Sequence, residues 1–591
     1  MMVKREGQMT SPTFAEKGLA GQTTAIFSYA ILLAGIITIG FSTYMAVVSY
    51  SSLPYWDGWI QINFAAGGGN PFTFDWLWSQ YNEHRMPIPK LFLLTDLHWF
   101  HARQVFLLLS IFAIQFLHLM VLSWSMRAFG NWRGAVWRTG VGLAAFCLFC
   151  PSQWENLTWG MQVCFVLPGL VASLSFVGLL LYWMRSNGTP SRSSSNWKYL
   201  LLSLATALVA TWSYVNGNLL WPLLLAAALL LRLRLAAVLS YAIAGTLSTA
   251  VYLQNYIRPS YAANSMKTPA NMLEHLAAYF GSSWVGSSSS FRLAEVIGTA
   301  GLVVCFLLLF RLPSYVKRWQ PFNIQLVLTL LFCAGTGLTT SVGRSSLGIS
   351  QAFSSRYQTV SLVFWCCLGL LLVGAAAAPQ RMRNNGFVLV QLTLLVIMLV
   401  GARYAKTPFI RARVRGIKLN TAAMSLVTNV PDIEQFRWAF WQPNSLPSFV
   451  PYMRRERLSV FDDPNSWLLS RPLESAFNLA PANECAGELE TSVVMRSVAA
   501  GPAALRITGW AWDYKRREPP SAIVVATDGI ITGLGAMGDY RPVNKTVRPW
   551  ITTNYIGYTA YIQEARTSGP VQVYAILRGS PARACLIATA K

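Results

Sequence analysis

Acidic residues are scarce in this chain. Its 591 residues include 23 Asp and Glu against 47 Lys and Arg, and charged residues make up only 12% of the sequence. A soluble domain carries about 25% charged residues, so the composition excludes an ordinary water-soluble globular protein. Carboxylates this rare are the first candidates for a function. Between Gly18 and Tyr404 there are seven: Asp57, Asp75, Glu83, Asp96, Glu155, Glu274 and Glu295.

Motifs that would point to other protein classes are missing as well. No phosphate-cradling glycine loop is present and only five histidines occur, so no nucleotide site of that kind is indicated. A zinc site built on cysteine is unsupported. The net charge of +24 comes from basic residues dispersed around apolar runs. This dispersion indicates membrane topology and argues against nucleic acid as a partner.

About eleven apolar runs recur as far as residue 404. Most are long enough to cross a hydrocarbon core as helices, which takes roughly twenty residues. The first run is too long, and too far from the chain start, for a cleaved signal peptide. We therefore expect an α-helical integral membrane protein with about eleven transmembrane helices over residues 25–404. The runs lie near 25–49, 105–126, 134–150, 161–184, 198–213, 218–231, 235–255, 293–311, 322–341, 358–378 and 386–404.

The charge of the connectors predicts the orientation. If residues 1–24 form a cytoplasmic tail, alternate connectors should also be cytoplasmic and rich in Lys and Arg. Five connectors fit this rule and contain no Asp or Glu. With an odd number of helices, everything after Lys406 then lies outside, and so do all seven carboxylates. The basic residues of these connectors are Arg127, Arg133 and Arg138; Arg185, Arg192 and Lys198; Arg232 and Arg234; Arg311, Lys317 and Arg318; and Arg381 and Arg383.

The outer tail divides into two parts. Residues 405–474 are basic and contain Pro and Trp, so we expect helices and irregular chain on the membrane surface. Residues 475–591 contain β-branched and aromatic runs at 504–512, 522–526 and 571–577, bounded by Gly, Pro and Asp. These runs predict the short strands of a β-sandwich domain.

Nine cysteines are present. Seven lie in apolar runs and are expected to be small, inert hydrophobic residues. The other two, Cys485 and Cys585, bracket the tail domain. In an oxidising periplasm they can pair and tie its first strand to its last. Two buried free thiols are the alternative.

The first outer loop, 50–104, opens with the segment Pro54–Trp59 directly after the first helix. Asp57 in this segment would lie at the membrane interface, flanked by aromatic residues that anchor there. A carboxylate at the mouth of a helical bundle can take a proton from a hydroxyl group. Asp57 is therefore a candidate general base, and a solvated loop carboxylate is the alternative.

The same loop contains a dense polar run, Asn82, Glu83, His84 and Arg85. Arg85 could bind a phosphate, and Glu83 and His84 could orient an acceptor. A helix cap with a surface ion pair is the alternative. The later polar residues of the loop do not favour a histidine-based metal site by their spacing; they are Asp96, His98 and His101.

Two further polar clusters flank later helices. Glu155 and Gln162 lie close to the membrane boundary, where an ionisable residue is usually functional and a structural hydrogen-bond partner is the alternative. Asn216 belongs to a tight polar turn between two spans. We interpret this turn mainly as packing beside the site.

Two arginines complete the candidates. Arg344 and Arg356, the latter followed by Tyr357, belong to the last outer loop before the tail. Guanidinium groups bind phosphate bidentately, so this pair suits a phosphate or diphosphate leaving group. Anchoring of lipid head groups is the alternative.

Together these motifs resemble the GT-C superfamily of glycosyltransferases, and within it a bacterial multi-spanning group. Enzymes of this superfamily take a sugar from a polyprenyl-phosphate carrier and pass it to an acceptor outside the membrane. The resemblance covers residues 20–405 and is weaker at Arg457–Phe461. It rests on Tyr-Trp-Asp at 55–57, Asn-Glu-His-Arg at 82–85, Gln-Trp-Glu-Asn-x-x-Trp-Gly-x-Gln at 153–162, Asn-Gly at 216–217 and Ser-Arg-Tyr at 355–357.

The resemblance implies an inverting transfer with Asp57 as the base, and with Glu83 and Glu155 as further candidate catalytic carboxylates. Gly58 follows Asp57, so the Asp-Glu pair of protein mannosyltransferases is absent. No cofactor is expected, and a divalent metal is left without support. The implied donor-phosphate residues are Arg85, Arg344 and Arg356. The implied substrate-binding residues are Asn82, His84, Gln162, Asn216 and Tyr357.

The partners implied by the resemblance are a polyprenyl-phosphate sugar donor, a glycan or lipid-linked acceptor, and the lipid bilayer. The location implied is the bacterial inner membrane, with a cytoplasmic N-terminus and a periplasmic C-terminal domain. The main alternative is a flippase or transporter of lipid-linked saccharides, which would need polar residues through the bilayer and on both faces. A polysaccharide polymerase or ligase, and a binding or scaffold role, are the others.

Overall fold

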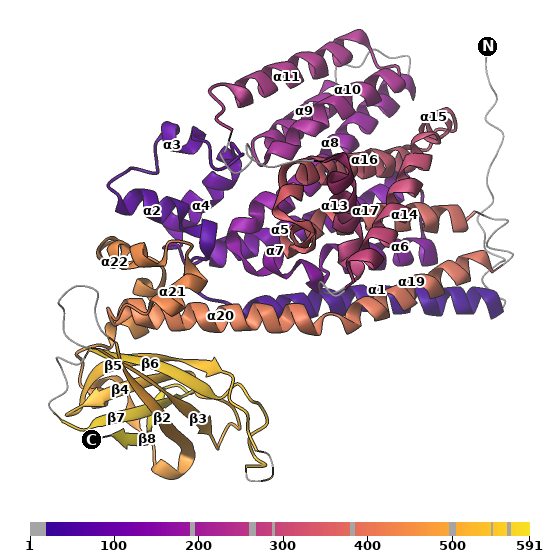
Figure 1. The fold of residues 1–591 in the computed structure, drawn as a ribbon. Coiled ribbons are helices and arrows are strands. Elements are labelled where there is room, and N and C mark those ends of the chain that lie inside the picture. Colours follow the sequence, from indigo (N-terminus) through magenta and orange to yellow (C-terminus); the bar gives the residue numbers. More distant parts are fainter. Residues whose placement is uncertain are drawn as a thin grey trace, which may run out of the picture.

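The computed structural model consists of a large helical part followed by a curled β-sheet (Figure 1). It describes residues 19–188, 196–258, 268–285, 290–378, 385–495, 504–544, 546, 548–563 and 569–590. The N-terminal tail as far as Gly18 lies outside the described residues. So do the connector residues Arg192, Arg381 and Arg383.

The helices of the described chain follow one another in this order. The first are α1 (Leu19–Val48), α2 (Ile60–Ala66), α3 (Phe74–Trp78), α4 (Pro87–Trp99), α5 (Val105–Ala128), α6 (Gly134–Leu148), α7 (Trp154–Thr158), α8 (Val163–Gly188), α9 (Trp197–Thr211), α10 (Leu220–Leu230) and α11 (Leu235–Leu253). Next come α13 (Pro269–Gly281), α14 (Phe291–Leu309), α15 (Leu312–Lys317), α16 (Pro321–Arg344), α17 (Gln358–Ala376) and α19 (Gly386–Arg403). The last are α20 (Lys406–Val427), α21 (Ile433–Ala439), α22 (Leu446–Arg455) and α23 (Leu473–Ala476).

Nine helical segments of the described chain are long and apolar enough to cross a membrane, so the chain is a multi-pass membrane protein. Two of the expected spans are too short: α9 has 15 residues and α10 has 11. At about 1.5 Å per residue, neither covers a hydrocarbon core of roughly 30 Å. The chain folds back between them at Gly217, where a Cβ would lie 2.0 Å from the Ala210 carbonyl oxygen.

The segment that contains α8 lies at the centre of the helical part. It is 83% buried, against 28% for α1 and 22% for α14, so the other helices pack around it. The outer helices expose large apolar side chains, among them Ile37, Phe306 and Leu399. Such side chains suit a surface that faces lipid, where every backbone polar group is already bonded within its helix.

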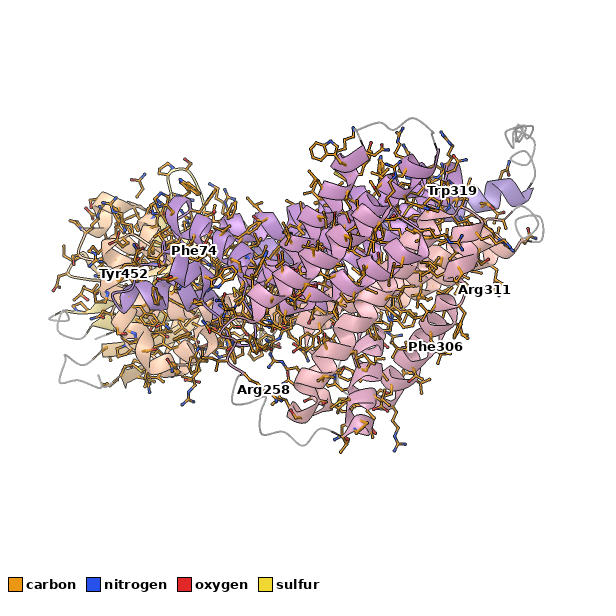
Figure 2. The ribbon with its side chains drawn as sticks, turned by 90° about the horizontal axis from the view of Figure 1, so that it is seen from above. Phe74, Arg258, Phe306, Arg311, Trp319 and Tyr452 are labelled. Atoms are coloured by element: carbon orange, nitrogen blue, oxygen red, sulfur yellow. A yellow bond between two sulfur atoms is a disulfide. The ribbon has the colours of Figure 1, made fainter. Side chains whose placement is uncertain are left out.

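The first loop and the connector around α15 lie far apart. Figure 2 shows Phe74 of the first loop and Tyr452 of α22 at one end of the molecule, and Arg311 and Trp319 at the other. The charge pattern assigns these two connectors to opposite sides of the membrane. Which end of the molecule faces which side of a membrane stays a prediction.

The C-terminal part is one curled sheet of eight strands, hydrogen-bonded in the order β1-β8-β7-β4-β5-β6-β3-β2. The strands expected at 504–512, 522–526 and 571–577 are confirmed as β3, β4 and β7. The strands are β1 (Asn478–Leu479), β2 (Cys485–Met495), β3 (Ala504–Asp513), β4 (Ala522–Thr527), β5 (Ile530–Asp539), β6 (Gly557–Gln563), β7 (Val571–Leu577) and β8 (Arg583–Ala590).

The expectation of a sandwich is wrong in that all eight strands belong to a single sheet rather than two. Register shifts interrupt four of its strand pairs. Bulges of this kind bend a strand and increase its twist. The sheet therefore curls around its own apolar core, which includes Ile507, Ile523 and Tyr558.

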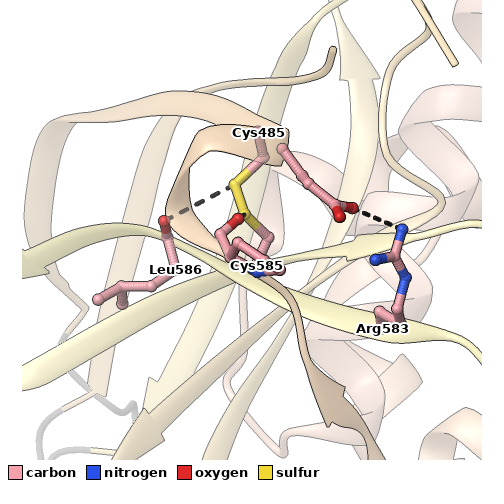
Figure 3. Close-up of a disulfide and its surroundings, with 6 residues drawn as sticks. Cys485, Arg583, Cys585 and Leu586 are labelled. Atoms are coloured by element: carbon pink, nitrogen blue, oxygen red, sulfur yellow. Dashed lines mark hydrogen bonds and ion pairs between the residues drawn. A yellow bond between two sulfur atoms is a disulfide. The ribbon is translucent and has the colours of Figure 1, made fainter. Parts of the chain in front are cut away.

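A disulfide joins Cys485 of β2 to Cys585 of β8 (Figure 3), as the sequence predicts. β2 is the edge strand at one end of the sheet, and β8 is next to the edge at the other end. The bond therefore ties the two ends of the curl together. Beside it, Arg583 pairs with Glu484 at 2.6 Å. The other seven cysteines are buried and free, also as predicted.

α20 joins the helical part to the sheet. It follows α19 closely, runs beside α1 and contacts β5 and β6 (Figure 1). One apolar core is shared by the first loop, α20 to α22 and the sheet. Its members include Trp59, Leu419, Phe449 and Val524. Residues 405–474 thus form the packing centre between the first loop and the sheet.

Candidate functional site

Asp57 lies in the 3₁₀ turn Trp56–Trp59. The Tyr81 hydroxyl donates a hydrogen bond to its Oδ1 at 2.7 Å. Trp59 is fully buried, and its Nε1 donates to the carbonyl oxygen of Ala439 in α21 at 3.1 Å. These contacts fix the turn from two directions. The Asp57 carboxylate is half-buried, so it is both held in place and reachable.

Glu155 lies in α7 and is held against the start of α17. The Ser355 hydroxyl donates to its Oε2. The neighbouring Asn156 donates through Nδ2 to the Arg356 carbonyl oxygen at 2.9 Å and to the Thr359 Oγ1 at 2.7 Å. Several hydrogen bonds from one buried amide hold the two segments together, although the Asn156 Oδ1 itself has no partner among the described residues. Segments 200 residues apart in the sequence therefore meet with defined geometry.

Arg356 lies within electrostatic range of both carboxylates. Its Nε donates to the Ser354 Oγ at 3.0 Å, and the charges of Glu155 and Asp57 both act on its guanidinium. Within the described part of the chain, Arg356 forms no direct ion pair with a carboxylate. The guanidinium therefore keeps donors for an anionic ligand.

Arg415 of α20 also reaches this place, and the sequence did not single it out as a site residue. Its guanidinium lies 4.9 Å from the ring centroids of both Tyr55 and Trp154. Its Nη2 donates to the Thr158 carbonyl oxygen at 2.6 Å. Nε and Nη1 are buried without a hydrogen-bond partner in the described residues. Unused donors on a buried guanidinium favour an anion nearby.

The one local sequence signal for Arg415 is the glycine after it. A Cβ at Gly416 would lie 2.4 Å from the Ser49 carbonyl oxygen. Glycine therefore lets α20 pack directly on the end of α1, and this contact carries Arg415 to α7. We call the resulting group the acid–arginine cluster; it consists of Asp57, Glu155, Arg356 and Arg415.

A narrow, mainly apolar cavity of about 30 Å³ adjoins this cluster. Tyr357, the residue after Arg356, lines it together with Tyr214, Asn216 and Cys164. This space holds about two water molecules, so a larger ligand would need the lining side chains to move. Its lining suits a hydrocarbon chain rather than a free sugar. The cluster and the cavity together offer a charged mouth above an apolar recess.

Of the predicted substrate-binding residues, Asn216 and Tyr357 line this cavity and Gln162 does not. The Asn216 Oδ1 accepts a hydrogen bond from the Thr339 hydroxyl at 3.1 Å. Gln162 is buried just before α8, and its Oε1 has no hydrogen-bond partner among the described residues. The Gln162 side chain is almost fully buried, so its role as a substrate-binding residue stays a prediction.

Glu83, His84 and Arg344 form a neighbouring group. Glu83 and His84 lie in a tight turn in which Asn82 has a φ of 50°. Arg344, at the end of α16, makes an ion pair with Glu83. His84 stacks on Tyr214 with ring centroids 3.8 Å apart. Burial lowers the pKa of His84 to about 4, so its ring is neutral at pH 7.

Arg85 lies apart from the acid–arginine cluster. Its guanidinium donates to the carbonyl oxygens of Tyr252, Gln254 and Trp78. These bonds tie the first loop to the end of α11. Most of the donors that a phosphate would need are therefore already used. Arg85 acts as an anchor of the loop, and we leave it out of the phosphate site proposed below.

No group of three or more His, Cys, Asp or Glu side chains that could hold a metal occurs among the described residues. Cys147 and Cys150 have C-x-x-C spacing and are buried, and Cys366 lies beside Cys147, but these thiols do not form a metal-holding group among the described residues. Asp96 instead caps α5, because its Oδ2 accepts from the Gln104 backbone N at 3.1 Å. Burial raises the pKa of Asp96 to about 7.

A scan against protein-family models finds no match for this chain, and a search of curated proteins finds no similar sequence. Its function must therefore be inferred from the site itself. The fold supplies a multi-pass helical protein with two carboxylates and two arginines gathered beside an apolar cavity.

Proposed function

We propose that this chain is a membrane glycosyltransferase that moves a sugar from a polyprenyl-phosphate donor to a glycan or lipid-linked acceptor. One observation carries the proposal: Asp57, Glu155 and Arg356 share one electrostatic neighbourhood, next to an apolar cavity that the following residue, Tyr357, lines. Transfer from a lipid-phosphate sugar needs a base near the sugar, a cation at the phosphate and an apolar surface for the lipid.

In this proposal the donor phosphate binds between Arg356 and Arg415, and the first isoprene units pack against the apolar lining of the cavity, which must widen to admit them. Arg356 supplies donors that are not in an ion pair, and Arg415 supplies its buried Nε and Nη1. Guanidinium groups bind phosphate with directed hydrogen bonds. Arg344 can assist only by exchanging its ion pair with Glu83 for the phosphate.

The reaction is an inverting single displacement. The acceptor hydroxyl oxygen forms a bond to the anomeric carbon of the sugar while the bond from that carbon to the phosphate oxygen breaks. Asp57 takes the hydroxyl proton as general base. The electron pair of the broken bond stays on the polyprenyl phosphate, whose growing charge the two arginines stabilise. Glu155 orients the acceptor or replaces Asp57 as base.

We further propose that the cluster lies on the periplasmic side of a bacterial inner membrane. The alternation of basic connectors supports this orientation. Asn82, His84, Gln162 and Asn216 are proposed to line the path of the sugar and the acceptor. Covalent transfer is what separates this function from transport of lipid-linked saccharides, so the test must detect a new bond.

The test is made on cells that lack the gene and on cells that carry the intact gene, an Asp57→Asn variant or an Asp75→Asn variant. Labelled sugar from a polyprenyl-phosphate donor must appear on acceptor glycan in membranes with the intact gene or Asp75→Asn and not in the other two, which detects the new bond. The donor itself is measured in lipid extracts of the same cells. Asp75 is the matched control because it is an exposed aspartate of the same loop. We expect one polyprenyl-phosphate sugar to accumulate without the gene and with Asp57→Asn, and to return to its normal level with Asp75→Asn. Equal levels in all four extracts would contradict the proposal.

A further inference from the structure

A second pocket lies away from the acid–arginine cluster, where α20 and α21 meet the sheet. Its volume is about 340 Å³. α20 contributes Lys418, α21 contributes Glu434, and the sheet contributes Arg506, Asp539 and Tyr540. We call this pocket the junction groove.

The charges of the junction groove are paired. Lys418 Nζ lies 3.6 Å from the Asp539 Oδ1, and Arg506 Nη1 lies 3.2 Å from the Glu434 Oε2. The third cation, Arg541, pairs with Glu490 outside the groove at 2.9 Å. Each of these three lining cations therefore already has a carboxylate partner. The groove offers many hydrogen-bonding groups and no excess charge of either sign, which disfavours a phosphate or an acidic chain as its ligand.

Two tyrosines form an aromatic wall on the sheet side. The rings of Tyr540 and Tyr555 lie 5.7 Å apart and nearly perpendicular. Arg413 of α20 lies over the Tyr555 ring at 3.9 Å and holds it in place. Tyr540 is 58% exposed, so its ring is open to a ligand. An exposed aromatic ring beside hydrogen-bonding groups is suited to a ligand with both apolar and polar faces.

The groove is rigid because its walls are locked together. Gly538 has a φ of 114°, and a Cβ there would lie 3.0 Å from Ile417, so glycine lets β5 approach α20. Behind the groove, the Tyr561 hydroxyl donates to the buried Asp432 Oδ2 at 2.8 Å. A preformed pocket loses little conformational entropy when a ligand binds.

The groove and the acid–arginine cluster are built on the same helix. Lys418 of the groove follows Arg415 of the cluster by three residues, a rise of about 4.5 Å along α20. The groove and the cluster are therefore neighbours along α20.

We propose that the junction groove binds an uncharged oligosaccharide, the non-reacting part of the acceptor. Sugar rings present hydroxyl groups at their edges for the paired charged side chains and C–H faces for the Tyr540 ring. This inference rests on the proposed glycosyl transfer for the role of the ligand. Binding itself can be measured without any transfer.

The experiment uses the purified full chain in detergent, probed with immobilised neutral hexasaccharides of glucose, mannose, galactose and arabinose and with oligogalacturonate as the acidic counterpart. We expect at least one neutral chain to bind and the acidic chain not to bind. Tyr540→Ala should weaken binding by about tenfold. Tyr514→Ala, a partly exposed tyrosine of the same sheet region outside the groove, should leave it unchanged.

The inference would be overturned if no neutral chain binds, or if only the acidic chain binds. It would also be overturned if the two tyrosine variants weaken binding equally. Thermal unfolding of both variants checks that each is folded. Asp57→Asn separates this inference from the proposed function. Retained glycan binding together with lost transfer supports both. Retained binding with normal transfer leaves the groove standing and removes Asp57 as the base.

Discussion

The Tyr81 hydroxyl donates a hydrogen bond of 2.7 Å to the Asp57 Oδ1. Tyr81 is in turn the first residue of the tight turn that carries Glu83 and His84. This one contact connects the acid–arginine cluster to the group around Arg344. Asp57 and Tyr81 are 24 positions apart in the first loop. Their contact therefore fixes the two neighbouring charged groups relative to each other.

Tyr81→Phe should slow transfer without abolishing it. The substitution removes only the hydroxyl that orients the carboxylate, and a hydrogen bond to a charged group contributes about 1.5–3 kcal/mol. A rate loss of about tenfold or more is expected, while Asp57→Asn should cost about 10² to 10⁴ because it removes the base. Transfer of labelled sugar in membranes compares the two. A larger loss for Tyr81→Phe than for Asp57→Asn would reject this assignment of roles.

Arg356→Ala should weaken donor binding and turnover together. A guanidinium that contacts the phosphate acts in the ground state and the transition state alike. Kinetics with varied donor concentration separate the two effects. Asp57→Asn serves as the comparison, since it should lower turnover while leaving donor binding nearly intact.

Arg415→Lys should not restore the function of Arg415. Lysine keeps the charge, but it cannot stack between Tyr55 and Trp154 or present several directed donors. We expect donor affinity to fall by about tenfold in Arg415→Lys, at the scale of one or two lost charge-assisted hydrogen bonds. Arg411→Lys, on the same helix, is the control. Equal donor affinity in the two variants would exclude Arg415 from the phosphate site.

The stability of the folded chain should decrease as the pH falls from about 6.5 to 4 because of His84. Burial lowers the pKa of His84 to about 4 in the folded state, against 6.5 for a free histidine. In this window the unfolded chain binds a proton that the folded chain does not, so acid favours unfolding. The loss should be smaller in His84→Gln. The readout is the slope of the unfolding temperature against pH, so a uniform loss of stability does not affect it.

Asp96 should act in the opposite direction. Burial raises its pKa to about 7 from 3.8, so between these values the folded chain binds the extra proton and stability falls as the pH rises. Asp96→Asn should therefore make the chain more sensitive to acid, and His84→Gln less sensitive. Slopes that change in the same direction in both variants would contradict these protonation states.

The Cys485–Cys585 disulfide should be present in the native protein and should stabilise the sheet. It closes a loop of 100 residues, for which the chain-entropy estimate is about 4–5 kcal/mol. The intact mass after alkylation without reductant measures the bond. Two alkylated thiols in the tail of the native protein would rule it out. In the wild-type protein, mild reduction should break the bond and lower the unfolding temperature of the sheet. In the Cys485→Ser, Cys585→Ser double variant, which has no bond to break, reductant should not change the unfolding temperature.

Local patterns in the sequence determined the elements of this protein. Apolar runs specify most of the candidate spans, because each must satisfy its backbone within one helix. Alternating β-branched and aromatic residues specify β3, β4 and β7. Cys485 and Cys585 lie outside the apolar runs and at the two ends of the tail domain, and the sequence predicted their pairing from this. The acidic residues were identified as candidates from their rarity alone.

The tertiary structure decided where those residues go. Arg85 follows Glu83 closely in sequence, yet it binds backbone carbonyl groups of α11, whereas Glu83 pairs with Arg344. Arg415 belongs to a segment expected on the membrane surface, yet it lies between Tyr55 and Trp154. The single curled sheet likewise depends on bulges that no alternation reveals. A hydropathy pattern predicts one helix or strand at a time. The positions of these residues depend instead on contacts between elements up to hundreds of residues apart, such as that between Ser355 and Glu155.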